Sequence, residues 1–285
     1  MLEAEYRFCR KGEWNLWVHS RRWDEGLWEE ALRRLTKEPR TKHPQTHRLR
    51  HSSGESHGEL YLKVYHSYEL LSALKDLFRD SKALRALKQG EALRREGFHA
   101  PLPMAAGEER SFRFLGRAFL LTVAVEGSSL PLFLRENFSL PLGTDALRKK
   151  RASLRQLALE IRRLHQCGFV HGDLIPSNIL VRSSEDGMTF FYLDNDRTRR
   201  YPRWLPQPLW KRNLVQLNRF VLPGISLQDR MRFLRSYLGK KEWGERERRL
   251  VRWLEKRTRR RRRECDRVEA QVTFRELMRW NGPYV

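Results

Sequence analysis

Residues 171–178 of this 285-residue chain read HGDLIPSN, and they are its most informative stretch. An acid, Asp173, is followed five residues later by an amide, Asn178. A second acid cluster, DND over residues 194–196, follows the apolar run FFYL at 190–193. The pattern predicts a loop that presents carboxylate and amide oxygens, followed by a strand that ends in acids.

These oxygen donors suit phosphoryl transfer. Moving a γ-phosphoryl group needs a carboxylate that orients the attacking hydroxyl and oxygen ligands that hold Mg²⁺ against the phosphates. Asp173 fits the first role, and Asn178 with Asp194 fits the second. Alone, Asp173 could be a turn-capping residue after a helix, but the joint spacing favours catalysis. We therefore predict Asp173 as the catalytic residue, Asn178 and Asp194 as metal ligands, and ATP and Mg²⁺ as cofactors.

The order of predicted elements indicates a bilobal, protein-kinase-like α+β fold. We expect a β-rich ATP-binding N-lobe over residues 1–127 and a mainly helical C-lobe over 128–285. The expected N-lobe strands lie near 14–23, 46–50, 59–65, 112–117 and 118–125, its helices lie near 28–35 and 81–96, and a turn is expected at Pro101 and Pro103. The expected C-lobe elements are a helix over 145–165, a short β-pair at 179–181 and 190–193, and further helices from 212 onward.

Lys63 is the candidate phosphate-binding lysine. It lies in the alternating run YLKVY (61–65), where a lysine that projects from an apolar strand can reach the α- and β-phosphates of ATP. An ordinary solvent-facing strand lysine is the alternative interpretation. Gly54, in the small-residue turn before this strand, would let the backbone approach the phosphates closely.

Two further parts of the ATP site are predicted from their place in the chain. Glu91, on the helix expected over 81–96, is the candidate partner of Lys63, with Glu69 as an alternative. The backbone at Val123 and Val125, where a strand leads into the next segment, is the candidate adenine-binding hinge. An ordinary strand exit and an exposed helix glutamate are the competing interpretations.

The net charge of +23 predicts an anionic partner. The densest basic run is KRTRRRRR over 256–263, and a second lies at 148–151. Both runs could contact a membrane, although a solvated arginine-rich helix face explains the first equally well. Because the chain has no RNA-binding signature, we expect no nucleic-acid partner.

The cysteines and the apolar runs indicate a compartment. Cys9, Cys167 and Cys265 are isolated and fit a reducing environment without a cysteine metal site. The apolar run at 119–125 is far shorter than the roughly 20 residues that span a bilayer. The first ten residues lack the apolar core of a secretory signal. A cytoplasmic protein is therefore expected.

With these motifs in view, the chain resembles the lipopolysaccharide core kinases, the Kdo/heptose kinase family with a protein-kinase-like fold. The resemblance runs from about Leu60 to Leu238. It rests on YLKVY (61–65), GFHAP (97–101), HGDL (171–174) with Asn178, LDNDR (193–197), NLVQLNR (213–219) and RFLRSYL (232–238). The last two stretches separate the chain from kinases at large.

The resemblance implies ATP-dependent phosphorylation of a sugar hydroxyl, on heptose or Kdo, in the lipopolysaccharide inner core. The implied partners are the core/lipid A glycolipid and the anionic surface of the inner membrane, with the protein peripheral on its cytoplasmic face. Such a membrane surface attracts basic residues.

Departures from the protein-kinase pattern keep other functions open. Gly172 stands where regulated protein kinases usually carry Arg, and Ile175 stands where they carry Lys. The acid cluster is DND rather than DFG, which argues against a Phe-driven switch. An atypical serine/threonine protein kinase with a basic, RNA-associated surface is the main alternative. A pseudokinase scaffold is a third, which the retained Lys63, Asp173 and Asp194 disfavour.

Overall fold

The computed structural model divides the chain into two compact units. The first comprises Met1–Glu126 and Phe191–Thr198, and the second comprises Gly127–Phe190 and Arg199–Val285. Within them the structure describes residues 5–37, 39, 41, 43–53, 56–66, 79–111, 114–138, 142–184, 187–202, 209–220, 222, 224–240 and 242–271. The acid cluster after the FFYL run therefore belongs with the N-terminal unit, although it lies far along the chain.

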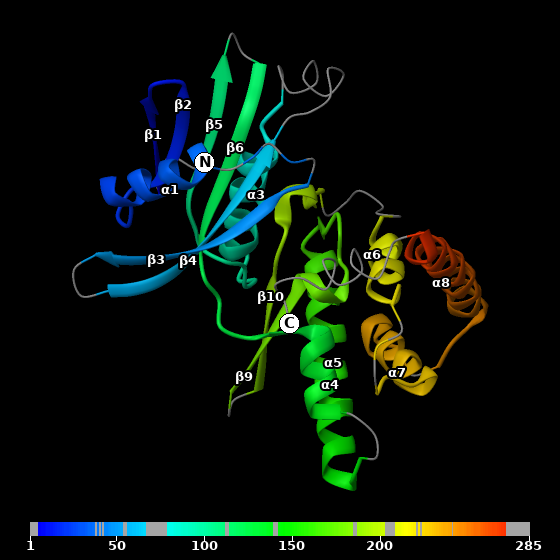
Figure 1. Ribbon diagram of the computed structural model, residues 1–285. Helices are drawn as coiled ribbons and strands as arrows, with labels where there is room; N and C mark the ends of the chain where they lie inside the picture. The colour runs from blue at the N-terminus through cyan, green and yellow to red at the C-terminus, as the bar shows by residue number, and fades with distance from the viewer. Residues whose placement is uncertain are drawn as a thin grey trace. The chain divides into compact units, whose positions relative to one another are not determined.

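A six-stranded antiparallel sheet forms the N-terminal unit (Figure 1), in the order β1-β2-β5-β6-β4-β3. The strands are β1 (Tyr6–Lys11), β2 (Trp14–His19), β3 (Gln45–Ser53), β4 (Ser56–His66), β5 (Pro103–Ser111) and β6 (Phe114–Val123). Two helices, α1 (Glu25–Lys37) and α3 (Lys82–Arg95), belong to the same unit.

Alternation along the strands builds one core on each face of this sheet. Leu62 and Val64 of β4 join a cluster that contains Leu27 and Ala31 of α1. Tyr65 joins a second cluster with residues of α3, among them Ala83 and Leu87. Since side chains alternate with period two, Lys63 lies on the same face as Tyr65, towards α3.

The strand pair β5–β6 corrects two predictions. The expected strands at 112–117 and 118–125 form one strand, β6, and the residues expected to turn at Pro103 begin β5. The β5 sequence, PMAAGEERS, lacks the β-branched residues that mark strands. Small residues are needed there, because a Cβ on Gly107 would collide with the Phe119 ring of β6. A proline is tolerated at the first residue of a strand.

Helix α3 has defined ends, as its sequence predicts. The Ser81 side chain accepts a hydrogen bond from Leu84 N (3.1 Å) and caps the first turn. Gly97 follows the helix with a φ of 75°, which glycine adopts without strain. This conformation turns the chain out of the helix and into β5.

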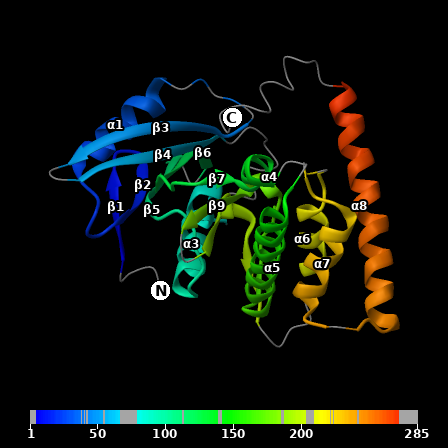
Figure 2. The same cartoon turned by 90° about the horizontal axis from the view of Figure 1, so that it is seen from below.

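The second unit is mainly helical. Its helices are α4 (Leu130–Phe138), α5 (Thr144–Gln166), α6 (Trp210–Leu217), α7 (Leu227–Leu238) and α8 (Glu245–Gln271). Its short strands are β7 (Ser128–Ser129), β8 (Phe169–Val170), β9 (Ile179–Ser184) and β11 (Arg199–Arg200), while β10 (Gly187–Tyr192) passes from this unit into the first. Figure 2 shows α8 as the long orange-to-red helix beside α6 and α7.

Helix α5 places the HGDLIPSN stretch. Leu157, Ile161 and Leu164 are buried at helical spacing on its inner face. After the helix, Gly168 has a φ of 84°, and a Cβ there would collide with the backbone oxygen of Tyr201. The chain then enters β8, which pairs antiparallel with β11 and directly precedes the HGDLIPSN stretch.

The predicted fold class is confirmed: the N-terminal region is an antiparallel sheet with helices, and the C-terminal part is mainly helical. Among the residues that the structure describes, no helix combines the length and the apolar character needed to cross a membrane.

Candidate active site

In the N-terminal unit, the structure brings Lys63 and Asp194 together. Lys63 Nζ lies 2.5 Å from Asp194 Oδ1 and 5.6 Å from the centre of the Tyr65 ring. The two charged residues are 131 positions apart in the sequence. A lysine held beside an acid in this way suits a site where phosphate oxygens and a cation bind next to each other.

Asp194 has an unusual backbone conformation that aims its side chain. It follows β10 with φ 55° and ψ 53°, the left-handed region, where it is the one described residue other than glycine with a positive φ. The turn after it is fixed by Asn195, whose Nδ2 donates to Tyr192 O (2.9 Å). Asp tolerates this region better than most residues, and such outliers concentrate at functional sites.

Asp196 is the second acid of this cluster. Burial raises the pKa of the Asp196 carboxyl, and the neighbouring Lys63 lowers it in part. Asp194 adds to the increase, because two nearby carboxylates resist ionising together. A bound cation would relieve this repulsion.

Glu91 does not pair with Lys63, and this corrects the predicted ion pair. The Glu91 side chain is 3% exposed, accepts a hydrogen bond from the Tyr6 hydroxyl (3.0 Å) and lies 3.5 Å from Arg94 Nε. Burial, with help from Glu5, raises the pKa of the Glu91 carboxyl. Glu91 therefore ties the first strand to α3, while Lys63 contacts Asp194.

Gly54, the predicted phosphate-binding glycine, lies outside the described residues, so its role stays a prediction. The described residues on either side of it, Ser53 and Ser56, pair with each other, whereas Lys63 pairs with Thr46 seven residues further along β4. At about 3.3 Å per residue, Ser56 and Lys63 lie about 23 Å apart along the strand.

The predicted hinge follows β6. The backbone N–H of Val123 donates to Leu102 O (2.9 Å), and that of Ala124 donates to Glu59 O (2.8 Å). The Val123 amide is therefore used within the fold. Val125, two residues later, lies beyond the last strand residue. The role of both residues in adenine binding stays a prediction.

In the C-terminal unit, hydrogen bonds between its own residues hold the HGDLIPSN loop. Asp173 N donates to His171 Nδ1 (3.2 Å), so the histidine braces the loop. Asn178 Nδ2 donates to Asp173 O (2.9 Å). This bond leaves Asn178 Oδ1 as the oxygen that can face a cation, in keeping with its predicted role.

Helix α6 holds the same loop from outside through two amide side chains. Asn213 Oδ1 accepts from His171 N (3.0 Å), and Asn213 Nδ2 donates to His171 O. Gln216 Nε2 donates to Gly172 O (2.9 Å), and Gln216 Oε1 accepts from Leu174 N (3.3 Å). The backbone on both sides of Asp173 is therefore fixed by hydrogen bonds.

A buried histidine supports Asn213 in turn. His165 Nε2 lies 3.0 Å from Asn213 Oδ1, and His165 Nδ1 lies 2.8 Å from the Tyr237 hydroxyl. Burial lowers the pKa of the His165 imidazole to about 4, so the ring is neutral at pH 7. Since Asn213 Oδ1 is an acceptor, Nε2 carries the proton and Nδ1 accepts from the tyrosine.

The sequence reasoning missed Asn213, Gln216, His165 and Tyr237 as supports of the loop. The stretches that hold Asn213, Gln216 and Tyr237 entered only through family resemblance, and His165 entered only as the end of the predicted helix over 145–165. One signal was present: Asn213 and Gln216 stand three residues apart on an otherwise apolar part of α6, so both amides face the same way.

The donors fit Mg²⁺, which prefers carboxylate and amide oxygens and usually retains substrate phosphates as further ligands. Asp194 of the N-terminal unit offers a carboxylate, and Asn178 of the C-terminal unit offers an amide oxygen, so each unit carries one donor of the kind that Mg²⁺ prefers. Within the described part of the chain, no three His, Cys, Asp or Glu side chains cluster as a preformed metal site. The joint role of Asn178 and Asp194 as metal ligands stays a prediction.

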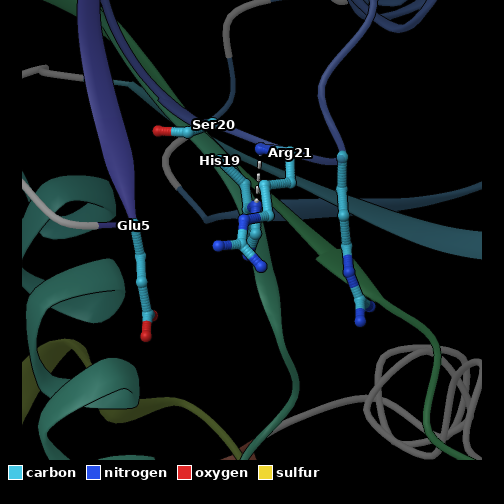
Figure 3. Close-up of a pocket in the computed structure, with 5 residues that line it drawn as sticks. Glu5, His19, Ser20 and Arg21 are labelled. Carbon is cyan, nitrogen blue, oxygen red and sulfur yellow. Dashed lines mark hydrogen bonds between the residues drawn. The ribbon is translucent and has the colours of Figure 1, made fainter.

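Each unit also contains a cavity whose lining includes none of the predicted site residues. The one in the N-terminal unit, of about 450 Å³, is lined by Glu5, His19, Ser20, Arg21 and Arg22 (Figure 3). Burial and the neighbouring Arg22 lower the pKa of the His19 imidazole.

The cavity in the C-terminal unit is larger, at about 580 Å³, and mainly apolar. Leucines of α4, α5, α6 and α7 contribute to its lining together with residues of α8, and Arg230, Arg259 and Arg262 add positive charge.

Comparison with known proteins identifies the family. The family model described as "Lipopolysaccharide kinase (Kdo/WaaP) family" matches residues 29–237. The chain belongs to the lipopolysaccharide kinase (Kdo/WaaP) family. Its predicted membership is confirmed, and membership in a kinase family makes it a phosphotransferase. Among curated proteins, no match was found.

The chain was also compared with solved structures. WaaP in complex with acyl carrier protein matches with a TM-score of 0.57 and 19% identity, over 79% of this chain and 87% of that chain. A double mutant of the PknI kinase domain from Mycobacterium tuberculosis matches with a TM-score of 0.35 and 14% identity, over 76% and 70% of the two chains. The WaaP match shows that this Kdo/WaaP family member has the WaaP fold.

Proposed function

We propose that the chain transfers the γ-phosphoryl group of ATP to a sugar hydroxyl, on heptose or Kdo, in the lipopolysaccharide inner core. The observation that carries the proposal is the loop around Asp173, which α6 holds rigidly while Asn178 keeps one amide oxygen available. Family membership indicates the acceptor class. A preorganised carboxylate is the main protein contribution that a loose phosphoryl transition state requires.

Each proposed role follows from the residue's surroundings. Asp173 accepts a hydrogen bond from the acceptor hydroxyl and orients it towards the phosphorus. Lys63 moves from Asp194 to the α- and β-phosphates, which frees the carboxylate for a cation. Mg²⁺, when bound, supplies positive charge that offsets the charge of the phosphates. Asn178 and Asp194 would hold that ion.

An acyl carrier protein is a second proposed partner, beside the glycolipid. The WaaP relative was solved in complex with such a protein. The apolar cavity of the C-terminal unit has the volume and lining that an acyl chain requires. Binding of acylated carrier with no binding of unacylated carrier would support this partner, and equal binding of the two would refute a role for the acyl chain.

The test is phosphate transfer from labelled ATP with Mg²⁺. Purified core glycolipid and a generic protein substrate are offered in parallel, and Asp173→Asn serves as the inactive variant. Asn137→Ala, a change at an exposed helix position, is the matched control. We expect label on the glycolipid, lost in the Asp173 variant and kept in the control. Label on protein alone would instead support an atypical protein kinase.

A further inference from the structure

Helix α8 carries two faces of different character. Its inner face packs on the C-terminal unit, where Leu254 and Thr258 are buried. The opposite side is exposed, and we call it the outer face of α8. It consists of Arg249, Arg252, Trp253, Lys256, Arg260 and Arg263, which share one side at a spacing of three and four residues.

The acids of α8 do not neutralise this face. Glu245 is shared by Arg249 and Arg252, at 4.0 and 2.9 Å. Glu264 is shared by Arg260 and Arg261, at 3.2 and 2.5 Å. Such exposed pairs contribute little and leave the cations accessible. The outer face therefore keeps a clear excess of positive charge.

An aromatic side chain lies in the middle of the basic face. Trp253 is 39% exposed, with Arg257 Cζ 5.7 Å and Lys211 Nζ 5.8 Å from its ring centre. Lys211 comes from α6, so two helices hold the indole between cations. A half-exposed tryptophan flanked by basic residues is typical of side chains that enter the interfacial layer of a membrane.

The second basic run does not form a comparable surface. Lys150 is buried and pairs with Asp229 at 2.6 Å, so it corrects the expectation that residues 148–151 jointly face a partner. That ion pair joins α5 to α7. The outer-face cations of α8 run from Arg249 to Arg263 and, at about 1.5 Å per residue, extend along about 21 Å of the helix. A long, straight row of charge suits a flat anionic surface.

We propose that the outer face of α8 docks the protein on an anionic lipid surface, with Trp253 inserted at the interface. The proposal rests on the proposed function, since an inner-core glycolipid acceptor is embedded in a leaflet. It adds which helix contacts the lipid surface and which residues of that helix make the contact. The buried face of α8 anchors the helix to the C-terminal unit.

Vesicle binding tests the proposal. The full chain is mixed with vesicles of phosphatidylcholine and phosphatidylglycerol, and with phosphatidylcholine vesicles alone. The face variant combines Lys256→Gln, Arg260→Gln and Arg263→Gln. The matched control removes the same charge from exposed positions of the N-terminal unit, with Arg7→Gln, Arg33→Gln and Arg34→Gln. Circular dichroism verifies that each variant is folded.

We expect the face variant to bind the anionic vesicles about a hundredfold more weakly, and the control to change far less. Trp253→Ser should also weaken binding without changing the salt dependence. Equal losses in the face variant and the control would overturn the proposal, because net charge alone would then explain binding. Binding of duplex RNA or an acidic carrier protein, with no vesicle binding, would overturn it as well.

Two activity measurements separate this proposal from the proposed function. The face variant should phosphorylate deacylated, water-soluble core oligosaccharide at the wild-type rate and bilayer-embedded glycolipid more slowly. Asp173→Asn should bind vesicles like the wild type while transferring no phosphate. If no glycolipid is ever phosphorylated but the vesicle results hold, the kinase assignment fails and the membrane surface stands.

Discussion

Replacing Asn213 by alanine should loosen the loop that carries Asp173. The change removes the acceptor for His171 N and the donor for His171 O, and both His171 and Asn213 are 1% exposed. A buried backbone group without a partner costs about 1–3 kcal/mol. Two such groups predict a loss of about 2–6 kcal/mol in the free energy of unfolding. Phosphate transfer should fall mainly in kcat.

The assay is guanidinium denaturation beside steady-state kinetics. Asn213→Asp keeps an acceptor for His171 N but lacks the donor for His171 O, so its loss should be smaller, at about 1–3 kcal/mol. The added charge should also raise the pKa of the His165 imidazole, which an NMR titration would detect. Asn137→Ala is the control. An Asn213→Ala protein with wild-type stability and kcat would refute the reasoning.

Three further predictions follow from described contacts. Lys63→Met should weaken ATP binding about 10- to 100-fold in an equilibrium titration, through loss of a charge-assisted hydrogen bond, and an unchanged Kd would contradict its role. Burial lowers the pKa of the His165 imidazole from 6.5 to about 4, so the unfolded chain binds the proton more readily than the folded chain does. The free energy of unfolding should therefore fall by about 3 kcal/mol as the pH is lowered from 6.5 to 4. His165→Asn should flatten that dependence in denaturation curves. Gly168→Ala should lower Tm, since its φ of 84° and the nearby Tyr201 oxygen exclude a Cβ, whereas Gly58→Ala, which meets no atom within 4 Å, should not.

The parts of the fold that follow from local pattern were predictable. The alternation in YLKVY placed Lys63 on the opposite side of β4 from Leu62 and Val64, and the helical spacing over 145–165 placed the loop after α5. The β5 strand was not predictable, because a small residue is required at Gly107 by the Phe119 ring of the next strand, which leaves no room for a Cβ. Only the packed sheet reveals that requirement.

The candidate site also has some parts that local sequence pattern predicts and others that it does not. The spacing between Asp173 and Asn178 is local, and it singles out the loop from the sequence. The spacing of residues predicts neither the left-handed backbone of Asp194 nor its contact with Lys63, which lies 131 positions away in the sequence. Glu91 was predicted to pair with Lys63 because of the helix on which it lies. Helical periodicity shows which face of a helix a residue occupies, but it does not show which residue that side chain contacts. Its contact with Tyr6 spans 85 positions.

The proposed role of Asp173 in directing phosphate from ATP to a core sugar can be measured directly. The measurement is the mass of purified core glycolipid after incubation with ATP, Mg²⁺ and either the wild type or Asp173→Asn, followed by fragmentation of the product. We expect a gain of one phosphoryl group, located on a heptose or Kdo residue, with the wild type alone. An unchanged glycolipid mass with folded, ATP-binding wild-type protein, or an equal gain with Asp173→Asn, would contradict it.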